Sequence, residues 1–151
     1  MTELNAEDMA VWHACKLLGD QVTRRVSADI TAASGLSGTD YGVLSRLADL
    51  GDGQLRQQVL TDSMQLHKGA MSHQLSRMET RGLISRERRG GGVEVALTAE
   101  GVRALAELRP VHAAAVRRHL LDRLSAEDRI ALRRIAVALE GEGRRIGGLP
   151  A

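Results

Sequence analysis

The stretch LHKGAMSHQLSRMETRGLISRERRGGGVEVALT, residues 66–98, carries the clearest structural pattern in this chain. Within it Met71, Leu75 and Met78 recur at helical spacing and form one apolar stripe. Gly82 follows, at a position where a left-handed residue commonly ends a helix. The pattern therefore predicts a helix over Lys68–Arg81, followed by a tight turn.

The residues after Gly82 predict a short two-stranded ribbon. Leu83–Arg86 and Val93–Leu97 are typical of strands, because aliphatic residues recur in both. A basic tip, Arg88-Arg89-Gly90-Gly91-Gly92, joins them. One interpretation is an ordinary surface helix and hairpin in a helix-rich domain. The other is a winged helix-turn-helix, which presents a polar helix and a basic hairpin to duplex DNA.

The second interpretation assigns a role to the polar residues. The first amides of the helix and Lys68 are expected to hold phosphates, because a helix N-terminus favours an anion. Arg77 fits the edge of a guanine, and serine or histidine can contact several bases. The predicted DNA-contacting residues are Lys68, Gly69, Ala70, Ser72, His73, Ser76 and Arg77 on the helix, Arg86, Arg88 and Arg89 on the hairpin, and Gln57 and Gln58 on the preceding helix.

Composition narrows the class of protein. The chain has 151 residues, of which 43% are hydrophobic and 1% aromatic, so Leu, Val, Ile, Ala and Met must build one core. No apolar run approaches the ~20 residues of a membrane span. The N-terminus is acidic and unlike a secretory signal, and the single cysteine suits a reducing cytoplasm. We find no catalytic, phosphate-loop or metal-ligand pattern, and expect neither an enzyme nor a cofactor.

Charge is distributed unevenly along the chain. Residues 1–65 hold 5 Lys or Arg and 9 Asp or Glu, residues 66–108 hold 7 and 5, and residues 109–151 hold 9 and 5. The basic part begins with the predicted DNA-contacting helix. This asymmetry points to a polyanionic partner.

Further helices are predicted on both sides of this stretch. A long first helix over Ala6 to about Ala33 has Val11, Cys15, Leu18, Val22, Val26 and Ile30 on one face. A second helix begins after Ser37 and turns Val43, Leu44, Leu47 and Leu50 inward, and a third runs from Leu55 to about Ser63.

Two helices are predicted after the hairpin. Thr98 caps the first, which should bend near Pro110 without breaking. Ser125 and Asp128 mark the start of the last, whose stripe is Ile130, Ala131, Ile135, Ala138 and Leu139. The predicted fold is mainly α with a small β-wing, in the order α-α-α-α-β-β-α-α. The long terminal helices are predicted to pack against a second copy of the chain.

The chain resembles the MarR family of transcriptional regulators. The resemblance is densest in LSGTDYGVLSRLAD (Leu36–Asp49), MSHQLSRMETRGLISR (Met71–Arg86) and VALTAEG (Val95–Gly101). It implies a homodimer that binds a pseudo-palindromic operator in double-stranded DNA, with the fourth helix in the major groove and the wing in the flanking minor groove. It also implies a repressor released by a small phenolic or anionic effector.

The resemblance further implies a single MarR-like domain over residues 1–151. Its winged-helix lobe would cover about 37–100, and its helical dimerisation region about 6–33 and 99–146. The wing departs from the family pattern of an Asp, one residue and an Arg, because Arg89 and Gly91 occupy those positions. Arg88 and Arg89 are the expected substitutes in the minor groove.

Three further hypotheses stay open. Trp12, His13, Lys16, Tyr41 and Arg46 are candidates to line an effector pocket, whereas Trp12 could instead pack at the dimer edge. Cys15 invites a thiol-based peroxide-sensing role, as in one branch of the family, against simple packing of a small apolar side chain. The last alternative is a helical dimer module that binds no DNA, for which the basic hairpin would have no purpose.

Overall fold

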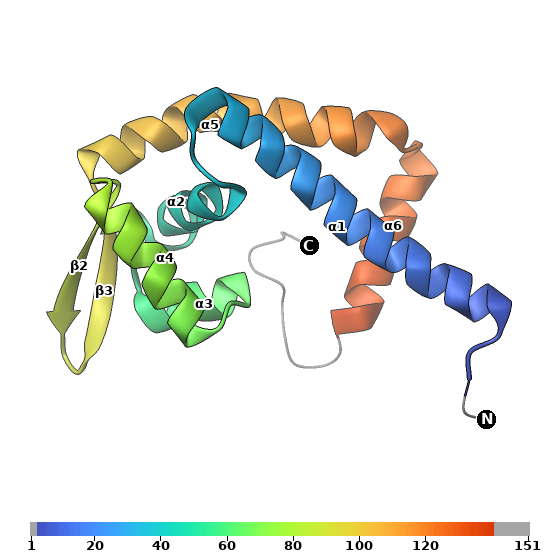
Figure 1. Cartoon of the computed structure of the whole chain (residues 1–151), viewed down its shortest axis with the longest axis horizontal. Coiled ribbons are helices and arrows are strands. Elements are labelled where there is room, and N and C mark those ends of the chain that lie inside the picture. The colour runs from blue at the N-terminus through green and yellow to red at the C-terminus, as the bar shows by residue number, and fades with distance from the viewer. Residues whose placement is uncertain (1–2, 141–151) are drawn as a thin grey trace.

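The computed structural model describes residues 3–140, and it places a compact lobe at one end of an elongated helical frame (Figure 1). Helices α2, α3 and α4 and the sheet make up the lobe, and α1 and α5 run side by side away from it. The elements are α1 (Ala6–Ser34), α2 (Gly38–Gly51), β1 (Gln54–Arg56), α3 (Gln57–Met64), α4 (Lys68–Thr80), β2 (Ile84–Arg89), β3 (Gly92–Leu97), α5 (Ala99–His119), the 3-10 helix η1 (Leu121–Arg123) and α6 (Ala126–Glu140).

The helix starts predicted from capping residues are confirmed. Ser37 and Asp40 form a reciprocal capping box at α2, and Thr98 Oγ1 accepts a hydrogen bond from the Gly101 amide at α5. Ser125 and Asp128 make the same exchange before α6. Helix α5 continues through Pro110, as expected.

The stretch Gln54–Arg56 corrects the predicted third helix. These residues form strand β1, which pairs antiparallel with β3, and the helix begins only at Gln57. The sheet therefore has three strands in the order β1-β3-β2 rather than two. Three residues are too few to show the alternation that identifies a strand, and this one exists because β3 offers it a free edge.

The core of the lobe is aliphatic, as the composition requires. Met71, Leu75 and Met78 of α4 are fully buried, which confirms the predicted stripe. They pack with α2, the sheet and α5 in one cluster, which contains Ile30, Leu36, Tyr41, Val43, Leu44, Leu47, Leu60, Leu83, Ile84, Val95, Leu105 and Leu108. Leu50, predicted to face inward, is 44% exposed because α2 has reached its last turn there.

The terminal helices are largely uncovered by their own chain. Ile30 is the one buried residue in α1, and α6 has none. Cys15, expected to pack in the α1 stripe, is exposed, because the N-terminal half of α1 extends past the lobe (Figure 1). The α6 stripe is also exposed, including Ile130 at 59% and Leu139 at 76%.

The predicted dimerisation region and the predicted single domain both extend beyond the residues that the structure describes. Residues 141–146 of the predicted dimerisation region, and the remainder of the 1–151 domain at the tail, lie outside the described residues. Among the described helices, none combines the length and the hydropathy needed to cross a membrane.

A close approach between α5 and the end of α4 fixes the two helices to one another. Thr98 Oγ1 donates a hydrogen bond to the Gly82 carbonyl at 2.6 Å, and the Thr98 amide donates to the Leu83 carbonyl at 3.2 Å. A Cβ built on Gly101 would lie 2.1 Å from the Leu83 carbonyl oxygen. Only glycine fits at this position.

We predict that Gly101→Ala lowers the free energy of unfolding by about 3 kcal/mol, although alanine is the better helix former. The added methyl group would force α5 away from the backbone of Leu83. Gly69→Ala in the first turn of α4 is the control, because nothing lies within 4 Å of that Cβ position. Denaturant unfolding of both variants is the measurement, and equal stabilities would contradict this packing.

Candidate nucleic-acid interface

The side of α4 opposite its buried stripe faces outward. All seven residues predicted there to contact DNA are exposed, and the buried residues between them are Met71, Gln74, Leu75 and Met78. Helix periodicity therefore separates the two sets cleanly. The outward set is Lys68, Gly69, Ala70, Ser72, His73, Ser76 and Arg77.

Helices α3 and α4 begin without a side-chain cap. The residues at their N-cap positions, Arg56 and His67, make no capping hydrogen bond through their side chains. Asn5, Ser37 and Thr98 do cap α1, α2 and α5. The first amides of α3 and α4 thus keep their donors free, and with Lys68 nearby they offer positive potential to an anion.

Arg86 connects α4 to the wing, which we define as β2, β3 and their turn. Its guanidinium donates to Ser76 Oγ at 2.9 Å and to Glu79 at 3.1 Å, and its amide donates to Glu79 at 3.0 Å. Ser76 also donates to the Ser72 carbonyl. Arg86 and Ser76, both predicted to contact DNA, are therefore already engaged in holding the wing against α4.

Arg88 and Arg89 point to opposite faces of β2, because side chains alternate along a strand. Arg88 shares a face with Arg86, which contacts α4, so it extends the outward surface of that helix. Arg89 pairs with Glu87 at 3.1 Å and Glu94 at 3.7 Å. Within residues 3–140 no carboxylate pairs with Arg88, which makes it the more available cation.

Arg56 of β1 supports the turn of the wing, a role that the sequence did not suggest. Its Nη1 donates to the Arg89 carbonyl, and a Cβ on Gly92 would lie 3.0 Å from that nitrogen. Gly90 and Gly91 make the turn with φ of +52° and +76°, a conformation that suits glycine. The pairing of β1 with β3 brings Arg56 to this turn. Because the sequence did not predict strand β1, it did not predict this role of Arg56 either.

Gln57 and Gln58 lie in the first turn of α3, next to its open N-terminus. Gln58 is exposed and donates to Asp62 at 3.0 Å. Gln57 is half-buried, and its Oε1 is buried without a hydrogen-bond donor among the described residues. Gln58 is therefore the better placed of the two for an external contact.

Comparisons with known proteins agree with this geometry. A MarR family model matches residues 34–92, which cover most of the lobe. The structure resembles AbsC of Streptomyces coelicolor, a MarR family transcriptional regulator, with 29% identity, 94% of this chain and 100% of that chain covered, and a TM-score of 0.81. It also resembles Sco3205 of the same organism, solved in complex with DNA, with 27% identity, coverage of 99% and 97%, and a TM-score of 0.87.

The lobe of this chain is MarR-like in sequence and in fold. A more distant relative in structure is the organohalide-sensing regulator RdhR-CbdbA1625, solved with 2,4-dichlorophenol, at 16% identity, coverage of 95% and 88%, and a TM-score of 0.77. No curated protein matches the sequence. The match to a family of transcriptional regulators agrees with the expectation that this chain is not an enzyme.

The five residues predicted to line an effector pocket are not brought together within a single chain. Trp12, His13 and Lys16 are exposed on the N-terminal half of α1, and Lys16 Nζ lies 5.5 Å from the centroid of the Trp12 ring. Tyr41 is buried, and Arg46 donates to the carbonyls of Ser63 and Gly42. A hollow of about 320 Å³ between α1, α5 and the end of α4 is lined by none of the five.

Tyr41 instead stacks on His112 of α5, with ring centroids 4.4 Å apart and planes inclined by 22°. Burial lowers the pKa of His112, and the positive charge of Arg109 lowers it further. Burial also raises the pKa of Tyr41. Arg109 is itself paired with Asp49 of α2. This stack fastens α2 to α5.

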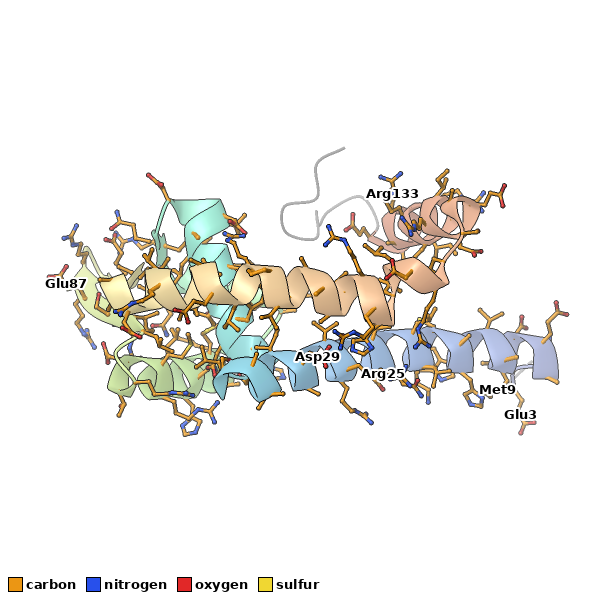
Figure 2. All side chains as sticks on the ribbon, turned by 90° about the horizontal axis from the view of Figure 1, so that it is seen from above. Glu3, Met9, Arg25, Asp29, Glu87 and Arg133 are labelled. Carbon is orange, nitrogen blue, oxygen red and sulfur yellow. The ribbon has the colours of Figure 1, made fainter. Side chains whose placement is uncertain are left out.

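The second histidine of α5 has a different partner. His119 Nε2 lies 2.9 Å from Asp29 of α1, which also pairs with Arg118 at 3.2 Å. Figure 2 shows Asp29 where α1 faces α5. Although His112 and His119 are two turns apart on one helix, each binds a separate neighbour.

The stack predicts a specific pH dependence of stability. Below pH 6.5, the ordinary histidine pKa, the unfolded chain binds a proton that folded His112 resists, so this site loses stabilisation as the pH falls. His112→Phe keeps a ring against Tyr41 but does not titrate. We expect its melting temperature to fall less than that of the wild type between pH 7 and pH 5.5, and parallel curves would contradict the assignment.

Proposed function

We propose that this chain is a cytoplasmic, homodimeric transcriptional repressor that binds a pseudo-palindromic operator. Helix α4 would enter the major groove, and the wing would contact the flanking minor groove. The observation that carries this proposal is the outward polar face of α4 beside two uncapped helix N-termini. A bound repressor would block a promoter by occupying it.

Two lines of support come from the relatives and from geometry. Sco3205, similar along nearly the whole chain, was solved in complex with DNA. The major groove of B-DNA is wide enough to admit an α-helix. Helix α4 has exposed serine, histidine and arginine side chains on one face and buried side chains on the opposite face. Amides at the start of α3 and α4 would hold backbone phosphates on either side.

The wing residues give the sharpest test of DNA binding. We expect the affinity for a duplex of unrelated sequence to fall with rising salt, because phosphate contacts release counterions. Arg88→Ala should reduce the slope of log affinity against log salt by about one unit. Arg89→Ala should reduce it less, since Glu87 and Glu94 already neutralise that side chain.

Fluorescence anisotropy over a salt series measures these slopes. Arg103→Ala, on the exposed side of α5 and paired with Glu100, is the matched control. If the wild type does not bind duplex DNA at low salt, the proposed function is wrong. If Arg88→Ala and Arg89→Ala have equal effects, Glu87 and Glu94 do not neutralise Arg89, and the greater availability assigned to Arg88 is wrong.

The proposed homodimer rests on apolar surface that a single chain leaves in water. Exposed large side chains lie on α1 (Met9, Val11, Trp12, Leu17 and Leu18) and on α6 (Ile130, Leu132, Ile135, Val137 and Leu139). Both helices occupy the end of the molecule away from the lobe, where Figure 2 shows Met9 on uncovered α1. Exposed large apolar side chains gathered on two helices of one chain are typical of a protein–protein contact.

We expect the wild type to elute as a dimer in light-scattering measurements. Ile135→Glu, at the middle of α6, should raise the dimer dissociation constant at least about tenfold, because a carboxylate would be buried without a partner. Val59→Glu in α3 introduces the same charge at an exposed apolar site of the lobe and should remain dimeric. A monomeric wild type would contradict this proposal.

The effector part of the proposal concerns an aromatic and cationic surface. Trp12 and Lys16 form a cation–π pair near the predicted dimer face, which suits a phenolic carboxylate. His13 lies beside them on α1, whereas Tyr41 and Arg46 lie on α2 and would meet this surface only if the second chain completes the pocket. Binding of an effector there would change how the two lobes are spaced on the operator.

Trp12 is the single tryptophan and reports on this surface directly. We expect 4-hydroxybenzoate to quench its fluorescence with saturation and to release DNA over the same concentration range. Lys16→Ala should weaken both effects together, because the carboxylate loses its charged partner. Quenching without saturation up to millimolar concentrations would argue against a phenolic effector at this place.

A further inference from the structure

A buried acid of α2 lies behind the one arginine on the outward face of α4. Asp40 is 6% exposed, and Gln74, on the buried side of α4, is 5% exposed. Gln74 Nε2 donates to Asp40 Oδ1, and Arg77 Nη2 donates to Gln74 Oε1. Two consecutive hydrogen bonds therefore lead from α2 through the core to Arg77.

The chemistry of the three groups fixes the direction of both hydrogen bonds. An ionised carboxylate only accepts hydrogen bonds, so Gln74 must turn its NH₂ group toward Asp40. Its carbonyl oxygen then faces the other way, toward Arg77, which only donates. With the opposite amide orientation, an amide NH₂ would face a guanidinium and repel it.

Asp40 is held in place independently of Gln74. Its Oδ2 accepts a hydrogen bond from the Ser37 amide at 2.8 Å in the capping box of α2, and Arg81 Nη1 lies 3.8 Å from the same oxygen. The other oxygen, Oδ1, is left for Gln74. The α2 cap therefore sets the position of Asp40, and through it the orientation of the Gln74 amide.

We propose that Asp40 and Gln74 are positioning residues that hold the Arg77 guanidinium in the orientation in which it contacts a guanine edge. This inference rests on the proposed function, because it assigns base specificity to Arg77 within the same interface. An arginine on a long flexible side chain loses rotamer freedom when it binds, and a partner that orients it beforehand reduces that cost. Neither positioning residue would touch DNA.

The test is a selection of bound sequences from a pool of randomised duplexes, with base preference at each position as the readout. We expect the wild type to prefer guanine at one position of each half-site by about tenfold or more. Arg77→Ala should lose that preference, and Asp40→Asn and Gln74→Met should lose it to the same degree. Arg81 lies near Asp40 Oδ2 and has no hydrogen bond to Gln74 among the described residues, so Arg81→Ala should keep the preference.

A compensating double variant separates positioning from a structural role. In Asp40→Asn the new amide can keep the Ser37 contact through its oxygen, but its NH₂ turns the Gln74 amide around and repels Arg77. Adding Gln74→Glu restores an acceptor for Arg77 while accepting from that NH₂. Asp40→Asn/Gln74→Glu should therefore recover the guanine preference that Asp40→Asn alone loses.

The outcomes are distinguishable. If Arg77→Ala loses the preference while Asp40→Asn and Gln74→Met keep it, or if Arg77→Ala keeps it, the positioning role is overturned. If Asp40→Asn does not fold, Gln74→Met decides alone, because it leaves the α2 cap intact. If the wild type selects no sequence at all, the proposed function fails together with the inference.

Discussion

Burial of Met71, Leu75 and Met78 against α2 and the sheet sets the orientation of α4 and, through α4, the position of the wing. Once those side chains are inside, helix geometry turns Ser72, His73, Ser76 and Arg77 outward without any further information. The same packing places Glu79 beside Arg86, so the wing is fixed relative to α4. The contact of Gly101 with the Leu83 backbone then attaches α5 to this unit. A core made almost wholly of aliphatic side chains thus determines the geometry of a polar surface.

A second constraint comes from the apolar side chains of α1 and α6, which the chain itself leaves exposed. The lobe closes its own core, yet α6 buries nothing and α1 buries only Ile30. Helices α1 and α5 are joined by the ion pair of Asp29 with Arg118 and by the contact of Asp29 with His119 Nε2, and α5 is joined to α2 by the stack of Tyr41 on His112. In a homodimer this chain of contacts would connect the apolar end of the molecule to the lobe. Spacing between two lobes would then depend on how α1 and α5 pack.

Much of this could be predicted from the sequence, because the signals were local. The capping residues Ser37, Thr98 and Ser125 predict the starts of three helices. The helical spacing of the apolar residues predicts the buried face of α4. Strand β1 could not be predicted, since Gln54–Arg56 becomes a strand only through pairing with a segment some 40 residues away. Arg56 as a support of the wing was missed for the same reason. The exposure of Cys15 was missed because a periodic apolar stripe does not reveal whether its own chain covers it.

Helix α4 is proposed to enter the major groove and the wing to contact the minor groove. One measurement tests both placements. Dimethyl sulfate methylates guanine N7 in the major groove and adenine N3 in the minor groove, so methylation interference on a duplex selected by the protein shows which groove carries the contacts. Entry of α4 into the major groove predicts that methylated guanines in both half-sites block binding, with weaker interference from flanking adenines. Binding that tolerates methylated guanines throughout both half-sites would contradict the placement of α4 in the major groove.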